Sequence, residues 1–454
     1  MPIAKLQENL NDFDPGVRAD ALGKLEALAR AKAIALEPET DLVNMHCHTF
    51  FSFNAYGHSP ASLAWLGKLR GLRAMGIVDF DVLDGVDEFL DACELVGVRG
   101  SAGIETRVFI PQYAGREINS PGEPGVCYHM GIGLTRSEPP GNVAPILTDL
   151  DRRAHARNQD MVRLINDLLD PVAVDYQRDV LPLTPSGHPT ERHLVVAYLR
   201  AAERTVSDPP AFWAGVLGVD REEIATLMPD QPALQSLIRA RLMKRAWAGQ
   251  KHPPAELFPS LEAFHELITA CGALPCAAWL DGTSSAERAI EEWLEFVVQE
   301  GVVALNIIPD RNWNIADPQL RRCRIRDLYR VVDLAREMDL PLNIGTEMNS
   351  FGQRLADDLA SAELLPVRRA FLDGALFVYG HTVLQRASGL GYQSDWARGF
   401  LSTRRRRNEF YTQVGHSVPA GKEGRALLRR LEPDMSPDEV MAALGGPVAG
   451  RNMG

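Results

Sequence analysis

Short apolar runs that end in polar residues recur along this chain, and helix-patterned segments separate most of them. The first run lies within residues 41–48 (DLVNMHCH), and six more follow at 73–78, 97–104, 125–133, 273–278, 302–308 and 341–345. Segments such as VDEFLDACELV and ERAIEEWLEFVVQEG carry the three- and four-residue apolar spacing of amphipathic helices. Strand followed by helix, repeated about seven times, predicts a parallel α/β barrel or a doubly wound sheet. In either fold, polar residues that follow the strands form the functional site.

Helical patterns also flank and interrupt the series. Roughly 130 residues of mostly helical character separate the fourth run from the fifth, which is too long for a plain connection and predicts an inserted subdomain. After the seventh run comes ALFVYG, a candidate eighth strand, followed by helical text. We divide the chain into a helical N-terminal extension, a first barrel part, a helical insertion, a second barrel part and a helical C-terminal extension, at 1–40, 41–135, 136–258, 259–390 and 391–454.

Composition narrows the class of protein. The 454 residues are 45% apolar and carry a net charge of -12, which is ordinary for a globular protein and gives no support for a nucleic-acid partner. The six cysteines are scattered and contain no CxxC pair, so we expect neither a disulfide framework nor a structural zinc knot. The N-terminus lacks a signal-peptide pattern, and no apolar stretch is long enough to span a membrane. We expect a cytoplasmic protein that acts on a small-molecule substrate and binds no membrane.

The strongest local signal is the pair His46 and His48 at the end of the first run. Two imidazoles in an H-x-H arrangement on a strand project to the same side and can share one metal ion. Two histidines that merely hydrogen-bond at a loop would give the same pattern. Asp79, Glu105 and His129 add candidate ligands from three further strands, although each taken singly suits an exposed carboxylate or a core histidine. Together they favour a hydrolytic centre of two or three metal ions.

At this point the sequence resembles the polymerase and histidinol phosphatase (PHP) superfamily, and within it the bacterial phosphoesterases with a helical insertion. The segments that carry the resemblance are VNMHCHTFFSF, MGIVDFDVLDGVDEF, AGIETRVF and YHMGIGL. The match is dense over residues 41–133 and looser over 260–350. It implies a distorted (β/α)7 barrel, in agreement with the seven runs, and a metal-dependent hydrolase that cleaves phosphoesters.

Position by position, the resemblance makes His46 and His48 metal ligands, Glu105 a bridging carboxylate and His129 a ligand of a second ion. Glu347 falls where the last strand of the family usually supplies an aspartate, and its carboxylate can still bind a hard or borderline cation. The implied cofactor is a divalent ion, Zn, Mn or Fe.

Other positions depart from the family pattern. Phe80 replaces the histidine of an Asp-His-Asp motif, Asn349 replaces a second histidine, and CAAWLDG stands where a His-Pro pair usually ends the fifth strand. Phe80 and Asn349 fall at positions that the family uses for a third ion, so we expect that ion to be missing. One metal site then keeps a full ligand set, and a second keeps a reduced one.

Candidate substrate contacts come from three places. The insertion segment PTERH is similar to an Arg-x-His segment of the phosphoesterases, which makes Arg192 and His193 candidate contacts to an anion; an ordinary helix start capped by Thr190 is the alternative. Arg311 and Asn349 lie in polar groups after the sixth and seventh runs, where turn chemistry is the alternative. We expect Asp79, Asp81 or His129 to transfer protons.

Two remaining features give weaker evidence for a functional site. His381 follows ALFVYG and could supply a missing imidazole, although a core or loop histidine fits it better. The basic run 404–407 is more typical of a solvated helix face than of a nucleic-acid site. The sequence therefore predicts a PHP-type hydrolase acting on a small phosphorylated or sugar-like substrate. The alternatives are an isomerase, lyase or other hydrolase of carbohydrate metabolism, and a degenerate barrel that binds a ligand without turnover.

Overall fold

Seven strands form one sheet in chain order in the computed structural model, which describes residues 1–243 and 255–446. The strands are β1 (Val43–Cys47), β2 (Ala74–Phe80), β3 (Arg99–Phe109), β4 (Val126–Leu134), β5 (Leu274–Trp279), β6 (Ala304–Ile307) and β7 (Leu342–Ile344). All neighbours pair in parallel except β4, which runs antiparallel to both β3 and β5. The connection from β3 to β4 holds one 3-10 turn, Pro111–Tyr113, and no crossover helix, so the chain returns antiparallel.

The residues just after β7 join its end to β1 and nearly close the sheet into a barrel. Glu347 N donates to His46 O at 2.8 Å, and His48 N donates to Glu347 O at 2.8 Å. This approach requires a glycine at position 345, because an added Cβ would lie 2.5 Å from His46 N. The predicted distorted (β/α)7 barrel is therefore confirmed. We call the end at which the parallel strands finish the barrel mouth.

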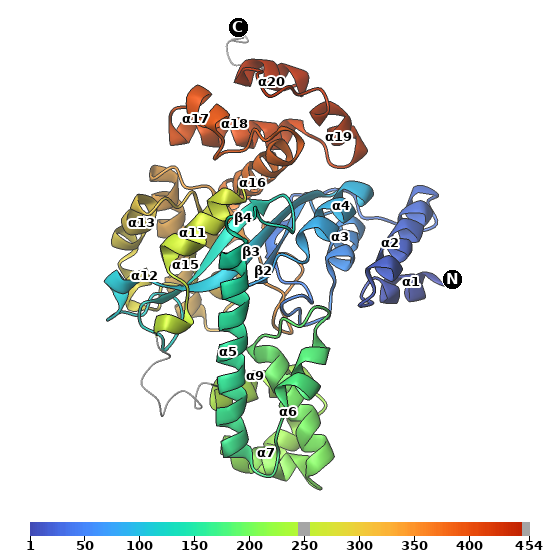
Figure 1. Ribbon diagram of the computed structural model, residues 1–454, viewed down its shortest axis with the longest axis vertical. Helices are drawn as coiled ribbons and strands as arrows, with labels where there is room; N and C mark the ends of the chain where they lie inside the picture. The colour runs from blue at the N-terminus through green and yellow to red at the C-terminus, as the bar shows by residue number, and fades with distance from the viewer. Residues whose placement is uncertain (244–254, 447–454) are drawn as a thin grey trace.

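Helices surround the barrel (Figure 1). Those that follow strands of the first half are α3 (Pro60–Leu69) and α4 (Val86–Val96), and those of the second half are α11 (Leu261–Ala270), α12 (Ser285–Arg288), α13 (Ile290–Gln299), α14 (Asp310–Trp313) and α15 (Pro318–Glu337). The N-terminal helices α1 (Ile3–Asn9) and α2 (Pro15–Arg30) pack on each other, and α2 also contacts α3 and α4. Both halves of the barrel share one hydrophobic core.

The segment ALFVYG is not a strand, which corrects the prediction of an eighth one. It lies inside α16 (Arg368–Ser388), a helix that contacts β1, β2, β3, β4 and β7. Gly374 packs on the Leu342 backbone at the start of β7, so α16 covers the barrel end opposite the mouth. The barrel covers one side of α16, and α18 (Arg404–Ser417) covers another, so α16 buries most of its surface. Its sequence is therefore apolar on several sides and has the same pattern as a buried strand.

The region between β4 and β5 is helical. Its elements are α5 (Ala144–Leu169), α6 (Glu191–Thr205), α7 (Pro209–Leu217), α8 (Arg221–Leu227) and α9 (Gln231–Ile238). The long α5 leads away from the barrel and lies beside the other helices in Figure 1. Buried residues from 161 to 243 form a hydrophobic cluster separate from the barrel core. Residues 244–254 of the predicted insertion lie outside the described part of the chain.

Short helices complete the C-terminal region around α18. They are α17 (Asp395–Phe400), α19 (Lys422–Leu428) and α20 (Pro437–Ala443), and residues 447–454 lie outside the described part. The basic run 404–407 begins α18, where Arg404 donates to Val302 O and Arg407 lies over the ring of Tyr392. Across residues 1–243 and 255–446, no helix combines the length and apolarity needed to cross a bilayer.

Candidate metal centre

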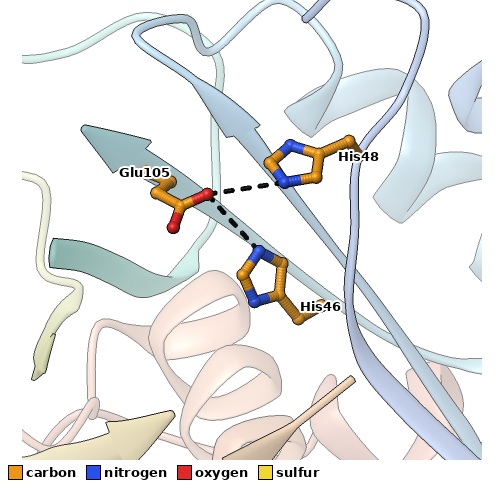
Figure 2. A group of neighbouring side chains, drawn as sticks. All are labelled: His46, His48 and Glu105. Atoms are coloured by element: carbon orange, nitrogen blue, oxygen red, sulfur yellow. Dashed lines mark ion pairs between the residues drawn. The ribbon is translucent and has the colours of Figure 1, made fainter. Parts of the chain in front are cut away.

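His46, His48 and Glu105 face one another inside the barrel, near its mouth (Figure 2). The two histidines are two residues apart at the end of β1, so both rings point to the same side, and Glu105 projects from β3. Glu105 Oε2 lies 3.5 Å from His46 Nε2 and 3.4 Å from His48 Nε2. All three side chains are buried.

Hydrogen bonds behind the rings fix which nitrogen of each histidine faces Glu105. His46 Nδ1 lies 3.2 Å from Asn306 Oδ1, an acceptor that also receives the Asn343 amide. His48 Nδ1 lies 3.2 Å from Ser52 Oγ, whose hydroxyl donates to Asp79 Oδ1 at 2.6 Å. Each Nδ1 therefore carries the hydrogen, and each Nε2 turns a lone pair toward the centre, as in metal-binding histidines with a second layer of partners.

The facing atoms lack a hydrogen-bond partner. His46 Nε2, His48 Nε2 and Glu105 Oε2 are buried acceptors to which no atom of the described residues donates. Leaving such groups without a partner costs about 1–3 kcal/mol each. Their ligand atoms lie within 4.8 Å of one another, and two imidazoles with a carboxylate are the donor set that Zn²⁺, Mn²⁺ or Fe²⁺ accepts. The residues therefore fit a divalent cation.

Burial and mutual charge set the protonation of this group without a metal ion. Burial raises the pKa of Glu105, and although burial lowers that of His46, its contact and charge interaction with Glu105 leave the His46 pKa raised. Burial and the neighbouring His46 lower the pKa of His48 to about 3. His48 is therefore neutral and able to donate its lone pair.

Glu347 lies beside the group, but its carboxylate faces another residue. Its Oε2 accepts from Arg311 at 3.2 Å and from Gln353 at 3.4 Å, and it does not join the group of atoms within 4.8 Å. Burial would raise the pKa of Glu347, but Arg311 and the two histidines outweigh it and hold the pKa to about 2. Glu347 is therefore an ionised carboxylate near the centre, and its role as a ligand stays a prediction.

Phe80 occupies the space beside His48. The two rings are stacked, and Phe80 pairs in register with Glu105 across β2 and β3. Phe80 thus packs directly against a candidate ligand.

The structure does not bring the predicted proton-transfer residues to this group. Asp79 accepts from Thr49 N, Thr49 Oγ1 and Ser52 Oγ, so its two oxygens hold the loop after β1. Asp81 binds Thr106 and Arg157, and so ties α5 to the barrel. Both carboxylates are occupied by these contacts.

His129 also points elsewhere, which the sequence could not show. In the antiparallel pairing of β3 and β4, His129 lies opposite Thr106 and Met130 lies opposite Glu105, so His129 is on the other face of the sheet from Glu105. Its Nε2 lies 2.8 Å from His265 Nε2 of α11, outside the barrel. The structure thus places His129 as a core histidine, away from a second ion beside Glu105.

Tyr128, next to His129, lies on the same face of the sheet as Glu105, as does Met130. It lies opposite Arg107, and its half-buried hydroxyl interacts electrostatically with Arg107, Arg192, Arg239 and Arg311. Three of these arginines are paired with carboxylates: Arg107 with Glu123, Arg239 with Glu191 and Arg311 with Glu347. Sequence reasoning missed Tyr128 because the orientation of β4 could not be read from its apolar pattern.

Arg192 reaches this region from the first turn of α6. Its guanidinium donates to Asn349 Oδ1 at 3.2 Å and to Ser350 Oγ at 2.6 Å, and lies over the ring of Phe53. Arg192 and Asn349, both predicted substrate contacts, thus lie together. The neighbouring His193 accepts from Thr190 N and forms a capping box with Thr190. His193 therefore caps the start of α6, as in the alternative of an ordinary helix start.

His381 is likewise a core residue. It lies in α16, accepts from Tyr392 N, and packs against Gly133 at the barrel end opposite the mouth. It therefore supplies no imidazole to the centre.

Sequence reasoning missed the two residues that orient the rings. Ser52 lies four residues after His48 in VNMHCHTFFSF, and Asn306 lies within the sixth apolar run, 302–308. Their position behind the histidines depends on how the loop after β1 and strand β6 approach β1, which only the fold defines.

Two distant neighbours among solved structures are similar to this chain. One is a candidate metal-dependent phosphoesterase from Bifidobacterium adolescentis, 18% identical, covering 73% of this chain and 98% of its own with a TM-score of 0.45. The other is an amidohydrolase from Chromobacterium violaceum with bound sulfate and no metal, 14% identical, covering 72% and 96% with a TM-score of 0.44. At these values neither neighbour assigns a function to this chain. No family model matches the sequence. No curated protein matches it either.

Proposed function

We propose that this protein is a metal-dependent hydrolase that binds a divalent cation through His46, His48 and Glu105 and cleaves a small phosphoester at the barrel mouth. The observation that carries the proposal is the meeting of three buried acceptor atoms with no donor among the described residues. A cation satisfies all three atoms at once, whereas one proton satisfies a single pair.

Arg192, at the mouth, supports an anionic substrate. Among the described residues Arg192 forms no ion pair, and its partners Asn349 and Ser350 are neutral. A half-buried guanidinium with neutral partners keeps its charge available for a phosphate or carboxylate, which its planar fork can bind through two hydrogen bonds. Arg311, in contrast, already binds Glu347. We therefore assign the first contact with the substrate anion to Arg192.

The chain's own residues supply orientation around the centre. At such a site a divalent cation polarises a phosphoryl oxygen and makes a water molecule more acidic. Asn306 and Ser52 hold the two rings, and Arg311 keeps Glu347 ionised as a hydrogen-bond acceptor. Asp79, Asp81 and His129 bind other partners, so the proposal gives them no proton-transfer role.

A second candidate function has an observation in its favour. With His129 on the outer face and Phe80 against His48, the described residues leave few side chains for a second ion beside Glu105. A single-ion centre also suits hydrolysis of a neutral bond or isomerisation of a sugar-like molecule.

Turnover assays separate the two candidates. Metal-free protein, reloaded with Zn²⁺, Mn²⁺ or Fe²⁺, is tested on phosphomonoesters, carboxylic amides and lactones, with and without a chelator. We expect chelator-sensitive phosphoester hydrolysis that Glu105→Gln lowers by more than about 100-fold and His58→Ala leaves unchanged. His58 is a suitable control because it lies at the far end of the loop after β1 and pairs with Ser62. Hydrolysis of amides or lactones alone would favour the second candidate, and absence of all turnover by the metal-loaded protein would contradict an enzyme.

A further inference from the structure

A second group of metal-binding side chains lies outside the barrel, at the root of the insertion. Asp151 and His155 are four residues apart on α5, so they share one face of that helix, and His188 comes from the loop before α6. Asp151 Oδ1 lies 2.6 Å from His188 Nδ1 and 3.3 Å from His155 Nε2. One ligand atom from each residue falls within 4.8 Å of the others.

We infer that Asp151, His155 and His188 form a second cation site, and that the ion it binds is Zn²⁺. Two imidazoles and one carboxylate leave a fourth position of a tetrahedral zinc site for water. Neighbouring ligand atoms of such a site lie about 3.3 Å apart. The distance from His155 to Asp151 already has this value, and the contact from His188 opens by about 0.7 Å. The three side chains are between 25% and 34% exposed, so they have room to move.

The far nitrogen of the His155 ring supports this assignment independently. His155 Nδ1 lies 2.7 Å from the hydroxyl of Tyr176. Histidines that bind metals usually donate their other ring nitrogen to an oxygen, which fixes the tautomer and the ring orientation. His188 Nε2 faces Asp84 Oδ2 at 4.0 Å, which is beyond hydrogen-bonding distance.

The position of the site gives it a structural consequence. Asp84 lies in the loop between β2 and α4, and Asn158 of α5 donates to Pro189 O next to His188. An ion held by α5 and His188 therefore joins α5 to the segment that begins α6. Arg192 lies on the first turn of that helix. We expect Zn²⁺ to stabilise the packing of α5 against the segment that begins α6, independently of the activity proposed for the barrel mouth.

Without a metal ion, the same residues form an ion pair. Burial lowers the pKa of His188, but its hydrogen bond to Asp151 outweighs burial and leaves the pKa raised, and the same contact lowers the pKa of Asp151. Zinc binding replaces this ion pair, because a histidine binds a metal ion through a neutral imidazole. A zinc site and a plain ion pair can therefore be distinguished by whether added zinc raises the stability of the protein.

The test removes the barrel centre first. In the double variant His46→Ala and His48→Ala, stripped with chelator and reloaded with Zn²⁺, we expect one ion per chain and a zinc-dependent rise in the unfolding temperature. Adding His155→Gln or His188→Gln should abolish both, and Co²⁺ should show the intense visible bands of tetrahedral coordination only when these histidines are present. The matched control is His416→Gln, since His416 also pairs with one aspartate, Asp373.

Circular dichroism of each variant confirms that it is folded. A folded double variant that binds no zinc would overturn the inference. Zinc binding that His155→Gln and His188→Gln leave unchanged would also overturn it. If these variants lower the unfolding temperature equally with zinc and with chelator, the three residues form an ion pair only and the inference is wrong.

Discussion

The ring of Phe80 lies flat against the imidazole of His48, with ring centroids 4.9 Å apart and planes 4° apart. This contact limits the rotation of a candidate metal ligand whose other restraint is a single hydrogen bond to Ser52. Stacking between an aromatic ring and a neighbouring ring is worth about 0.5–1.5 kcal/mol. Phe80 therefore orients the centre although it cannot bind a metal.

Removing that ring should loosen His48. We expect Phe80→Ala to weaken metal binding about tenfold, in the range measured for residues behind metal ligands, and Phe80→Tyr to keep it within about twofold because the stack is retained. Titration calorimetry with Zn²⁺ or Mn²⁺ gives both affinities. Equal affinities for the two variants would show that the stack contributes nothing.

The hydrogen bonds behind the rings make a second prediction. We expect Ser52→Ala to weaken metal binding about 10- to 100-fold, because His48 then loses the acceptor that holds its tautomer. Ser62→Ala is a matched control: Ser62 Oγ lies 3.0 Å from Nδ1 of His58, which is outside the centre. If both serine variants change the affinity alike, the orienting role of Ser52 is wrong.

Arg192 should bind the substrate anion. With inorganic phosphate as the probe, we expect Arg192→Ala to weaken binding to the metal-loaded protein about tenfold, and Arg192→Lys to recover only part of it because lysine lacks the planar fork. Arg204→Ala, on the same helix but paired with Asp179, serves as the control. Unchanged phosphate affinity in Arg192→Ala would remove this residue from the binding site.

Buried histidines predict a loss of stability in acid. Burial lowers the pKa of His381 to about 4, whereas the unfolded chain has a histidine pKa of about 6.5. Below pH 6.5 the unfolded state therefore binds a proton that the folded state does not, so this contribution to stability is full above pH 6.5 and is lost as the pH falls toward 4.

Urea unfolding between pH 7 and pH 4 measures this effect. We expect His381→Gln to reduce the pH dependence of the free energy of unfolding by up to about 1.4 kcal/mol per pH unit. His416→Gln, on an exposed histidine, should leave the dependence unchanged. A wild-type slope retained in His381→Gln would contradict the assignment of a neutral buried imidazole.

The sequence predicted the parts of the molecule that local pattern determines. The H-x-H pair and Glu105 each follow or end a clear apolar run, and parallel strands bring such residues to one end of a barrel. His129 failed because its run gives no sign of antiparallel pairing, and a strand's direction and register decide which face a residue takes. The strand predicted at ALFVYG failed because α16 is buried on several sides and lacks a polar face.

Glu347 shows a different limit. The resemblance to the PHP superfamily predicted Glu347 as a ligand, and its backbone pairs with β1 next to both histidines. The direction of its carboxylate, however, depends on Arg311, which arrives from α14 and could not be paired with it from sequence.

The most direct test of the account is the metal content of the barrel centre. Stripped protein is reloaded with Zn²⁺ or Mn²⁺, dialysed, and measured by inductively coupled plasma mass spectrometry for the wild type, His48→Ala, Glu105→Gln and the control His58→Ala. The account predicts that His48→Ala and Glu105→Gln each lose one ion per chain relative to the wild type, and that His58→Ala loses none. Equal metal content in all four proteins would contradict a centre formed by His46, His48 and Glu105.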